Sequence, residues 1–354
     1  MRFPEFTEEW VNVSLKDVAD FQKERISSGL LDESTYISTE NILQNFQGVQ
    51  SAISIPANTN VVAYKKNDIL LSNIRPYLKK VWFSDRIGGC SADVFVLRSK
   101  TCEPEFLYNV IASDKFINYV MSGAKGVKMP RGDKNQMESF SFSIPAVVEQ
   151  RKISRLFQLL DERIVTQNKI IEKLQSLIKG ITILLTAKGK PNTTIAQCLE
   201  CHSSTLQESE VSHSGLYKVF GANGLVGYTD MPQMNGDAIL IIKDGSGVGT
   251  TSYAQGEFSV IGTLNYLTAI SNYDLRYLYF VLSVFNFQSY KTGMAIPHIY
   301  FKDYGNAKIF CPPLSEQKRI ANVLGKLESK LCLEQNILAS FNLQKRYLLG
   351  QMFI

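Results

Sequence analysis

The sequence predicts an α+β fold: two mixed α/β domains separated by a pair of long helices that form an antiparallel coiled coil, in a pseudo-two-fold internal repeat. A phrase that introduces a helix occurs twice, as "PAVVEQRKISRLFQLLD" from Pro145 and "PPLSEQKRIANVLGKLE" from Pro312, 167 residues later. A heptad pattern follows each copy, and strand-rich sequence precedes each copy. No other segment carries the heptad pattern, so each long helix is expected to pack against the other.

The repeat divides the 354 residues into four parts. We expect a first α/β domain over residues 1–144, a central helix region over 145–190, a second α/β domain over 191–311 and a C-terminal helix region over 312–354.

The domain cores are predicted to be rich in strands, with one or two helices each. "TNVVAYKKNDILLSNI" in the first domain and "GEFSVIGTLNYLTAI" in the second carry short β-branched and apolar runs bounded by turn residues. Two further pairs of segments parallel each other. "FLYNVIASDKFINYVMSGAKGVKMPRG" parallels "YLYFVLSVFNFQSYKTGMAIPHIYF", and "NDILLSNIRP" parallels "GDAILIIKDG". The whole chain therefore reads as two related halves.

Each long helix is expected to begin just after a proline, with Glu149 or Glu316 in its first turn, where the helix dipole favours negative charge. The predicted seam of the first helix is Ile153, Phe157, Leu160, Ile164, Ile171, Leu174, Ile178, Ile181 and Leu185. That of the second is Ile320, Leu324, Leu327, Leu331, Leu338, Phe341, Leu348 and Met352. Gln167 and Glu334 interrupt the two seams at the same step, and such polar residues can fix register. The alternative is a pair of ordinary amphipathic helices.

Composition narrows the class of protein. The chain is 45% hydrophobic and 20% charged, as expected of a globular protein with real cores. Its 38 Lys and Arg against 33 Asp and Glu give a net charge of +5, so any nucleic-acid surface must be local. We expect a cytoplasmic protein, because neither a signal segment nor an apolar run of about 18 residues is visible. The six cysteines are scattered and do not suggest a disulfide framework.

Antiparallel packing of the two helices would place the domains at opposite ends of a rod. About 34 helical residues give roughly 50 Å of helix, or about 15 base pairs of DNA. Such a spacing would suit a split recognition site with an unread middle.

The order domain–helix–domain–helix, with the helix opening P-x-x-x-E-Q-[RK]-[KR]-I present twice, resembles the specificity subunit of type I restriction–modification systems. "YISTENIL" from Tyr36 to Leu43 also resembles the early strand region of such a subunit's first target-recognition domain. The resemblance covers essentially the whole chain and implies a non-catalytic reader of a bipartite duplex DNA site that binds no cofactor or metal itself. It implies two methyltransferase subunits as partners, which bring S-adenosylmethionine, and a restriction subunit that can join with ATP and magnesium. The different loops of the two halves predict an asymmetric site.

Basic residues of the first domain cluster in "AYKKNDILLSNIRPYLKKVWF" and in the glycine-containing "SGAKGVKMPRGDKNQ". The candidates for DNA contact there are Lys65, Lys66, Asn73, Arg75, Tyr77, Lys79, Lys80, Lys125, Lys128, Arg131, Lys134 and Gln136. Lysines suit phosphates, whereas Asn73, Arg75, Arg131 and Gln136 have donors that suit base edges. The alternative is a solvated charged face.

The second domain is less basic, and its candidates are Lys243, His298, Tyr300 and Lys302. The last three lie in "TGMAIPHIYFKD", at the place of the first domain's basic loop. The stretch "IKDGSGVGTTSY" lacks the lysine of a P-loop, so a glycine-rich turn is the favoured reading. Asp244 could accept a hydrogen bond from cytosine.

The partner-binding residues are predicted on the outward faces of the two helix starts: Gln150, Arg151, Gln317 and Lys318. "CLECH" from Cys198 to His202 matches a haem-attachment pattern, and a zinc site there would need two more ligands, with only His202 and His213 nearby. Two semi-buried thiols at the start of the second domain are the favoured reading. A protein-binding scaffold is the competing function, and steep salt dependence of DNA binding would separate the two. A hydrolase or haem protein would need a cofactor or catalytic cluster that the sequence does not display.

Overall fold

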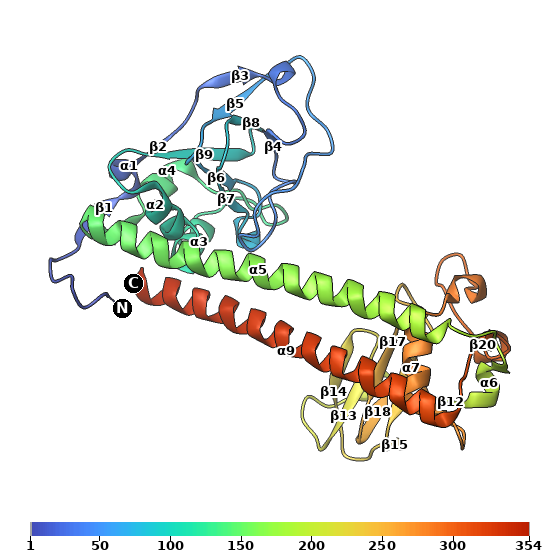
Figure 1. The fold of residues 1–354 in the computed structure, drawn as a ribbon. Coiled ribbons are helices and arrows are strands. Elements are labelled where there is room, and N and C mark those ends of the chain that lie inside the picture. The colour runs from blue at the N-terminus through green and yellow to red at the C-terminus, as the bar shows by residue number, and fades with distance from the viewer. Residues whose placement is uncertain (1, 354) are drawn as a thin grey trace. The chain divides into compact units, whose positions relative to one another are not determined.

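The computed structural model describes residues 2–353 and forms two compact units (Figure 1). The first unit comprises Met1–Gln167 and Ile337–Ile354, and the second comprises Asn168–Asn336. Two long helices, α5 (Val147–Thr186) and α9 (Leu314–Met352), each contribute to both units. Each unit therefore combines one α/β domain with part of each helix, whereas the sequence division groups the helices separately.

The first unit contains two four-stranded sheets and a two-stranded ribbon. One sheet has the order β2-β9-β6-β7, formed by Ala19–Phe21, Val94–Ser99, Ile69–Ser72 and Val81–Phe83. The other has the order β3-β5-β8-β4, formed by Arg25–Ser27, Asn60–Tyr64, Gly88–Cys90 and Tyr36–Ile37. The ribbon pairs β1 (Val11–Ser14) with β10 (Ser141–Ile144). All four residues of β6 are buried, as expected of a central strand.

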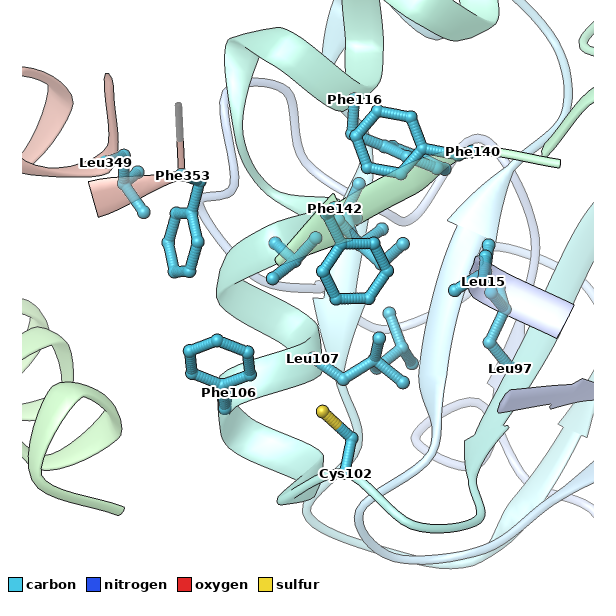
Figure 2. Packing of buried hydrophobic residues seen from close by; sticks show 14 of the residues in the cluster. Leu15, Leu97, Cys102, Phe106, Leu107, Phe116, Phe140, Phe142, Leu349 and Phe353 are labelled. Atoms are coloured by element: carbon cyan, nitrogen blue, oxygen red, sulfur yellow. The ribbon is translucent and has the colours of Figure 1, made fainter. Parts of the chain in front are cut away.

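Four short helices complete this unit: α1 (Leu15–Val18), α2 (Pro104–Ile111), α3 (Asp114–Ser122) and α4 (Lys134–Glu138). Figure 2 shows Phe353 beside Phe106 of α2, and their rings meet edge to face at 5.4 Å. Phe157 of α5 stacks on Phe353 at 6.2 Å. Both long helices thus close the core of the first domain.

The second unit repeats this architecture. Its first sheet has the order β12-β19-β16-β17, formed by Leu199–Ser203, Leu264–Ala269, Ala238–Ile242 and Thr251–Ala254. Its second has the order β14-β13-β18-β15, formed by Gly224–Thr229, Tyr217–Gly221, Glu257–Val260 and Met234–Asn235. A ribbon pairs β11 (Thr193–Thr194) with β20 (Lys308–Ile309), and the helices are α6 (Ile195–Cys198), α7 (Leu275–Ser283) and α8 (Phe301–Tyr304). Single 3₁₀ turns occur at Ser28–Leu30, Pro76–Leu78, Glu208–Glu210 and Phe287–Tyr290.

The predicted internal repeat is confirmed, and strand pairing corrects its alignment by one residue. Ile69 pairs with Leu97 in the first unit, and Ile239 pairs with Leu267 in the second. These pairs make Asp68 equivalent to Ala238, so the aspartates that directly precede β6 and β16, Asp68 and Asp237, lie one position apart when the two sheets are aligned. The two carboxylates also differ in their partners. Asp68 is buried and holds Arg98 through two bonds of 2.8 and 2.7 Å, whereas Asp237 accepts from the Tyr253 hydroxyl at 2.8 Å.

The long helices run antiparallel within each unit. In the first, early α5 residues share a core with the end of α9, and Lys345 forms an ion pair with Asp161. In the second, Ile181 and Leu185 near the end of α5 pack against the cluster that contains Ile320 and Leu324 of early α9. Every predicted seam residue is buried or half-buried, and the seam positions Gln167 and Glu334 are buried too. None of the helices among residues 2–353 is both long and apolar enough to cross a membrane.

Candidate nucleic-acid interface

Three loops of the first unit are joined into one frame by backbone hydrogen bonds. They are residues 73–80 between β6 and β7, residues 91–93 between β8 and β9, and residues 123–133 between α3 and α4. The N–H of Asn73 donates to the Asp93 carbonyl at 2.8 Å, and the N–H of Gly132 donates to the Asn73 carbonyl at 3.1 Å. The N–H of Arg75 donates to the Pro130 carbonyl at 2.8 Å. We call this arrangement the first loop frame.

The longest of these loops carries a hairpin. Lys125 and Arg131 exchange two backbone bonds of 2.9 Å each, so the five residues between them project as a tip. Gly126 has φ +96°, a conformation that glycine adopts without strain. Pro130 then presents its carbonyl to Arg75. The hairpin is therefore fixed at its base, and its tip side chains are held away from the domain core.

The second unit builds the same frame from a different sequence. The N–H of Lys243 donates to the Thr263 carbonyl at 3.0 Å, and the N–H of Ile299 donates to the Lys243 carbonyl at 3.0 Å. The N–H of Gly245 donates to the Pro297 carbonyl at 3.0 Å. Thr292 and His298 close its hairpin with bonds of 2.9 and 2.7 Å. These bonds match those of the first frame one by one. We call this the second loop frame.

The two frames differ in the side chains that they display. In the first, a guanidinium N–H of Arg131 donates to the Asp93 carboxylate at 2.8 Å. In the second, the Nδ1 atom of His298 lies 2.6 Å from a carboxylate oxygen of Asp244. Thr263 of the second frame lies at the position that Asp93 has in the first. Ile74 of the first frame lies at the position that Asp244 has in the second. Each frame thus orients a nitrogen-bearing side chain with a carboxylate from a different loop.

Arg75 occupies a position at which glycine would be less strained. Its φ and ψ are 52° and 61°, in the left-handed region, and its equivalent Gly245 has φ +96°. A residue with a Cβ atom costs of order 1 kcal/mol more than glycine there. Lys79, at the other end of the same 3₁₀ turn, is also left-handed with φ 52°. Strain kept at non-glycine residues is typical of functional sites.

Unsatisfied polar atoms also concentrate on the frames. Among the described residues, six buried side-chain nitrogen or oxygen atoms have no hydrogen-bond partner. Three of the six belong to frame residues: Asn73 Oδ1, Arg75 Nε and Thr263 Oγ1. Most buried polar atoms in proteins find partners, so such a concentration marks a region shaped by function.

The other predicted residues of the 73–80 loop are arranged around this frame. Lys79 forms an ion pair with Asp114 at the start of α3, and Lys80 donates to the Thr39 carbonyl. Burial lowers the pKa of Lys80. Tyr77 is exposed. Lys65 and Lys66 lie instead on the turn between β5 and β6, where Lys65 pairs with Glu24 at 3.2 Å. Within residues 2–353, neither lysine forms a hydrogen bond or ion pair with the frame.

The predicted residues of the 123–133 loop divide into exposed and inward-facing groups. Lys125 is exposed but pairs with Asp133 at 2.9 Å, and this hydrogen bond lowers the pKa of Asp133. Lys128 is exposed at the tip. Lys134 pairs with Glu138 and lies over the Phe21 ring. The Gln136 amide, predicted to suit a base edge, donates instead within the first unit, to the Tyr119 carbonyl at 2.6 Å and to the Ser122 hydroxyl at 3.2 Å.

In the second unit, His298, Tyr300 and Lys302 lie together. The His298 and Tyr300 rings stack at 6.5 Å, and the Lys302 ammonium lies 5.3 Å from the Tyr300 ring centre. The glycine-rich segment connects β16 and β17, as the turn interpretation predicted. A hollow of about 430 Å³ lies between residues 246–251 and residues 283–291.

The structure corrects the outward orientation predicted for two of the four partner-binding residues. The Gln150 amide donates to the Pro145 carbonyl at 2.8 Å and accepts from the Glu103 N–H at 2.8 Å. Gln317 repeats this with the Pro312 carbonyl at 2.8 Å and the Asp274 N–H at 2.9 Å. Both glutamines are buried, and each joins a long helix to the N-cap residue of α2 or α7. Arg151 and Lys318 are exposed, as predicted.

The "CLECH" segment distributes its groups over a helix end and a strand. Cys198 is fully buried with its Sγ atom 3.9 Å from that of Cys311, whereas Cys201 is half-buried on β12. His202 stacks on Tyr266, and its Nε2 atom lies 3.0 Å from the Thr268 hydroxyl. No group of three or more His, Cys, Asp or Glu side chains within the described part of the chain could hold a metal ion.

Sequence reasoning missed two features of the interface. Asp93 lies in an unremarkable loop and is brought to Arg131 only by the tertiary fold. The apolar tip residues Val127, Met129, Met294 and Ile296 are all exposed. The repeated pattern x-Gly-x-x-x-Pro-[Arg/His], in "KGVKMPR" and "TGMAIPH", lies within the two segments already matched from the sequence, and its apolar positions could have pointed to these tip residues.

The fold and its loops define an internally duplicated protein that carries the same loop frame in each half. The family described as "Type I restriction modification DNA specificity domain" matches residues 7–176 and 196–342. The chain belongs to this family.

Individual relatives are distant. The specificity subunit of type I restriction enzyme EcoDI from Escherichia coli is 23% identical over 198 residues, which are 55% of this chain and 44% of that protein. The MjaVIII specificity subunit from Methanocaldococcus jannaschii is 26% identical over 187 residues, 51% of this chain and 43% of that one. This chain thus covers less than half the length of either relative.

Two solved structures share the fold. The S subunit of a type I restriction–modification system from M. genitalium superposes with a TM-score of 0.68 at 16% identity, over 98% of this chain and 96% of that one. A chain from a structure titled for complex assembly and conformational transition of the type I R-M system gives 0.59 at 19% identity, over 97% of each.

Proposed function

We propose that this chain is a DNA specificity subunit, which reads a split and asymmetric duplex site and directs partner methyltransferase subunits to it. The observation that carries the proposal is the loop frame, present twice with one backbone geometry and two sets of side chains. A shared backbone gives both frames the same approach to a helical ligand. Different side chains on that backbone select different base edges.

The first loop frame has the chemistry for a DNA duplex. Arg75 and Arg131 can each donate two hydrogen bonds to guanine, and the exposed Lys128 can contact phosphate. In the second frame, His298, Tyr300 and Lys302 take these roles. The Asp244 carboxylate orients the His298 ring, which leaves its Nε2 atom for a base edge.

The partners follow from the non-catalytic role. Methyl transfer would be supplied by two methyltransferase subunits that bind S-adenosylmethionine, and cleavage by a restriction subunit that uses ATP and magnesium. The exposed Arg151 and Lys318, at equivalent starts of α5 and α9, remain our candidates for contacting the two methyltransferase copies. This chain would bind none of those cofactors itself.

The decisive experiment is long-read mapping of adenine methylation in host cells with and without the gene. We expect a split, non-palindromic motif that disappears on deletion and returns when the gene is restored. An unchanged methylome, with the partner methyltransferase shown to be expressed, would contradict the proposal and favour a protein-binding scaffold.

Salt dependence gives a second prediction. Affinity for the mapped duplex should fall steeply with ionic strength, and Lys128→Ala should reduce the slope of log K against log salt by about 1. Lys16→Ala removes another exposed lysine of the same unit, on α1, and should leave the slope unchanged. Equal slopes for wild type and Lys128→Ala would remove Lys128 from the phosphate contacts.

A further inference from the structure

Each loop frame carries an apolar side chain at its most exposed point. Val127 and Met294 occupy the same position of the two hairpins, and both are fully exposed. Met129 and Ile296, two residues further on, are also equivalent and are 48% and 58% exposed. Single exposed apolar residues are common on protein surfaces. Two pairs at equivalent positions of related loops need a specific explanation.

The hairpin tips are held in place by their bases. Both hairpins are closed by two backbone bonds, and their proline carbonyls accept bonds from Arg75 and Gly245. A Cβ atom on Gly293 would lie 2.3 Å from the Ile296 carbonyl oxygen, so the second hairpin is closely folded as well. A preorganised tip loses little conformational entropy when its side chains are buried by a ligand.

The surroundings of the tips favour a polyanion with apolar interior surfaces. Lys128 lies on the first tip and Lys125 and Arg131 close its base, while Lys291 and His298 lie at the base of the second. Duplex DNA combines phosphates at the groove edges with thymine methyl groups and base faces inside. A protein partner would not require the tip to lie beside the base-reading side chains of each frame.

We propose that both hairpin tips enter DNA grooves, where Val127 and Met129, or Met294 and Ile296, contact the apolar surface of bases. This inference rests on the proposed function, because it states which part of the DNA the tips of the same two frames contact. The surface contacted is either a thymine methyl group or the face of a partly unstacked base pair. Lysine and arginine would then position each tip, and the tip would add discrimination at the step it touches.

The test uses the chain assembled with its methyltransferase subunits and a duplex that carries the mapped site. Met294→Ser and Val127→Ser are expected to weaken duplex affinity roughly tenfold each, the effect of losing burial of one apolar side chain. Met231→Ser and Ile87→Ser change exposed apolar residues outside the frames and should leave affinity unchanged. Affinity equal to wild type in both tip variants would overturn the inference.

Modified duplexes separate the two apolar surfaces. If the fluorescence of a 2-aminopurine in the duplex rises when the wild type binds but not when Met294→Ser binds, the result supports unstacking. If replacing thymine with uracil lowers the affinity of the wild type but not that of Met294→Ser, the result supports a methyl contact. Tip variants that lose methyltransferase subunits while binding the duplex normally would overturn the inference and assign the tips to a protein interface. Wild-type protein that fails to prefer the mapped duplex would instead defeat the proposed function.

Discussion

Arg75→Gly is expected to weaken binding of the target duplex by roughly 10- to 100-fold without lowering the free energy of unfolding. The loss of affinity follows from removing a guanidinium that can donate twice to one guanine. Stability should be retained because Arg75 has φ 52°, which glycine adopts without steric strain, and because its buried Nε atom has no partner. The equivalent Gly245 already occupies this frame position with φ +96°.

Competition binding and urea unfolding would measure the two quantities on the same preparation. Asn67→Gly is the matched control, since Asn67 has φ 71° on the turn between β5 and β6, outside the frame. The control should keep full affinity. A methylation map of Arg75→Gly should show relaxed sequence at one position of one half-site. Unchanged affinity, or a clear loss of stability, would assign Arg75 a structural role.

Gln150→Leu and Gln317→Leu are each expected to lower the free energy of unfolding by about 2–4 kcal/mol. Leucine fills the space but leaves a backbone N–H and a carbonyl buried without partners, each of which costs about 1–3 kcal/mol. The affected pairs are Glu103 with Pro145, and Asp274 with Pro312. Because each glutamine lies in a different compact unit, each variant should destabilise its own unit first.

Urea unfolding followed by hydrogen exchange would show which unit opens. Gln175→Leu, on an exposed face of α5, is the matched control and should change stability by less than about 0.5 kcal/mol. The same variants also test the predicted contact with methyltransferase subunits. If the Gln150 and Gln317 variants unfold normally yet lose methyltransferase binding, the partner-binding role predicted from the sequence would stand in place of the structural one.

The repeat was readable from the sequence because it rests on local chemistry. A proline, an early glutamate and a heptad of apolar residues specify a helix and its buried face within the segment itself. Ile153 and Ile320 are buried accordingly. The basic and glycine-containing stretches of the first domain also include two of the loops that the structure joins into the first frame. The fold decides the local partners of the individual residues in these stretches: Gln136 donates to the Tyr119 carbonyl, and Lys65 pairs with Glu24.

The tertiary structure decided which of these residues act together. Asn73, Asp93 and Arg131 come from three loops, and only strand pairing and backbone bonds between loops bring them into one frame. The same holds for Asp244 and His298, which lie 54 residues apart in the chain. Gln150 and Gln317 appeared as surface residues because a glutamine near a helix start is usually solvated. The sequence by itself thus determined the duplicated domain-and-helix plan, since that plan depends on short-range periodicity. The interface depended on contacts between distant segments, which no local pattern encodes.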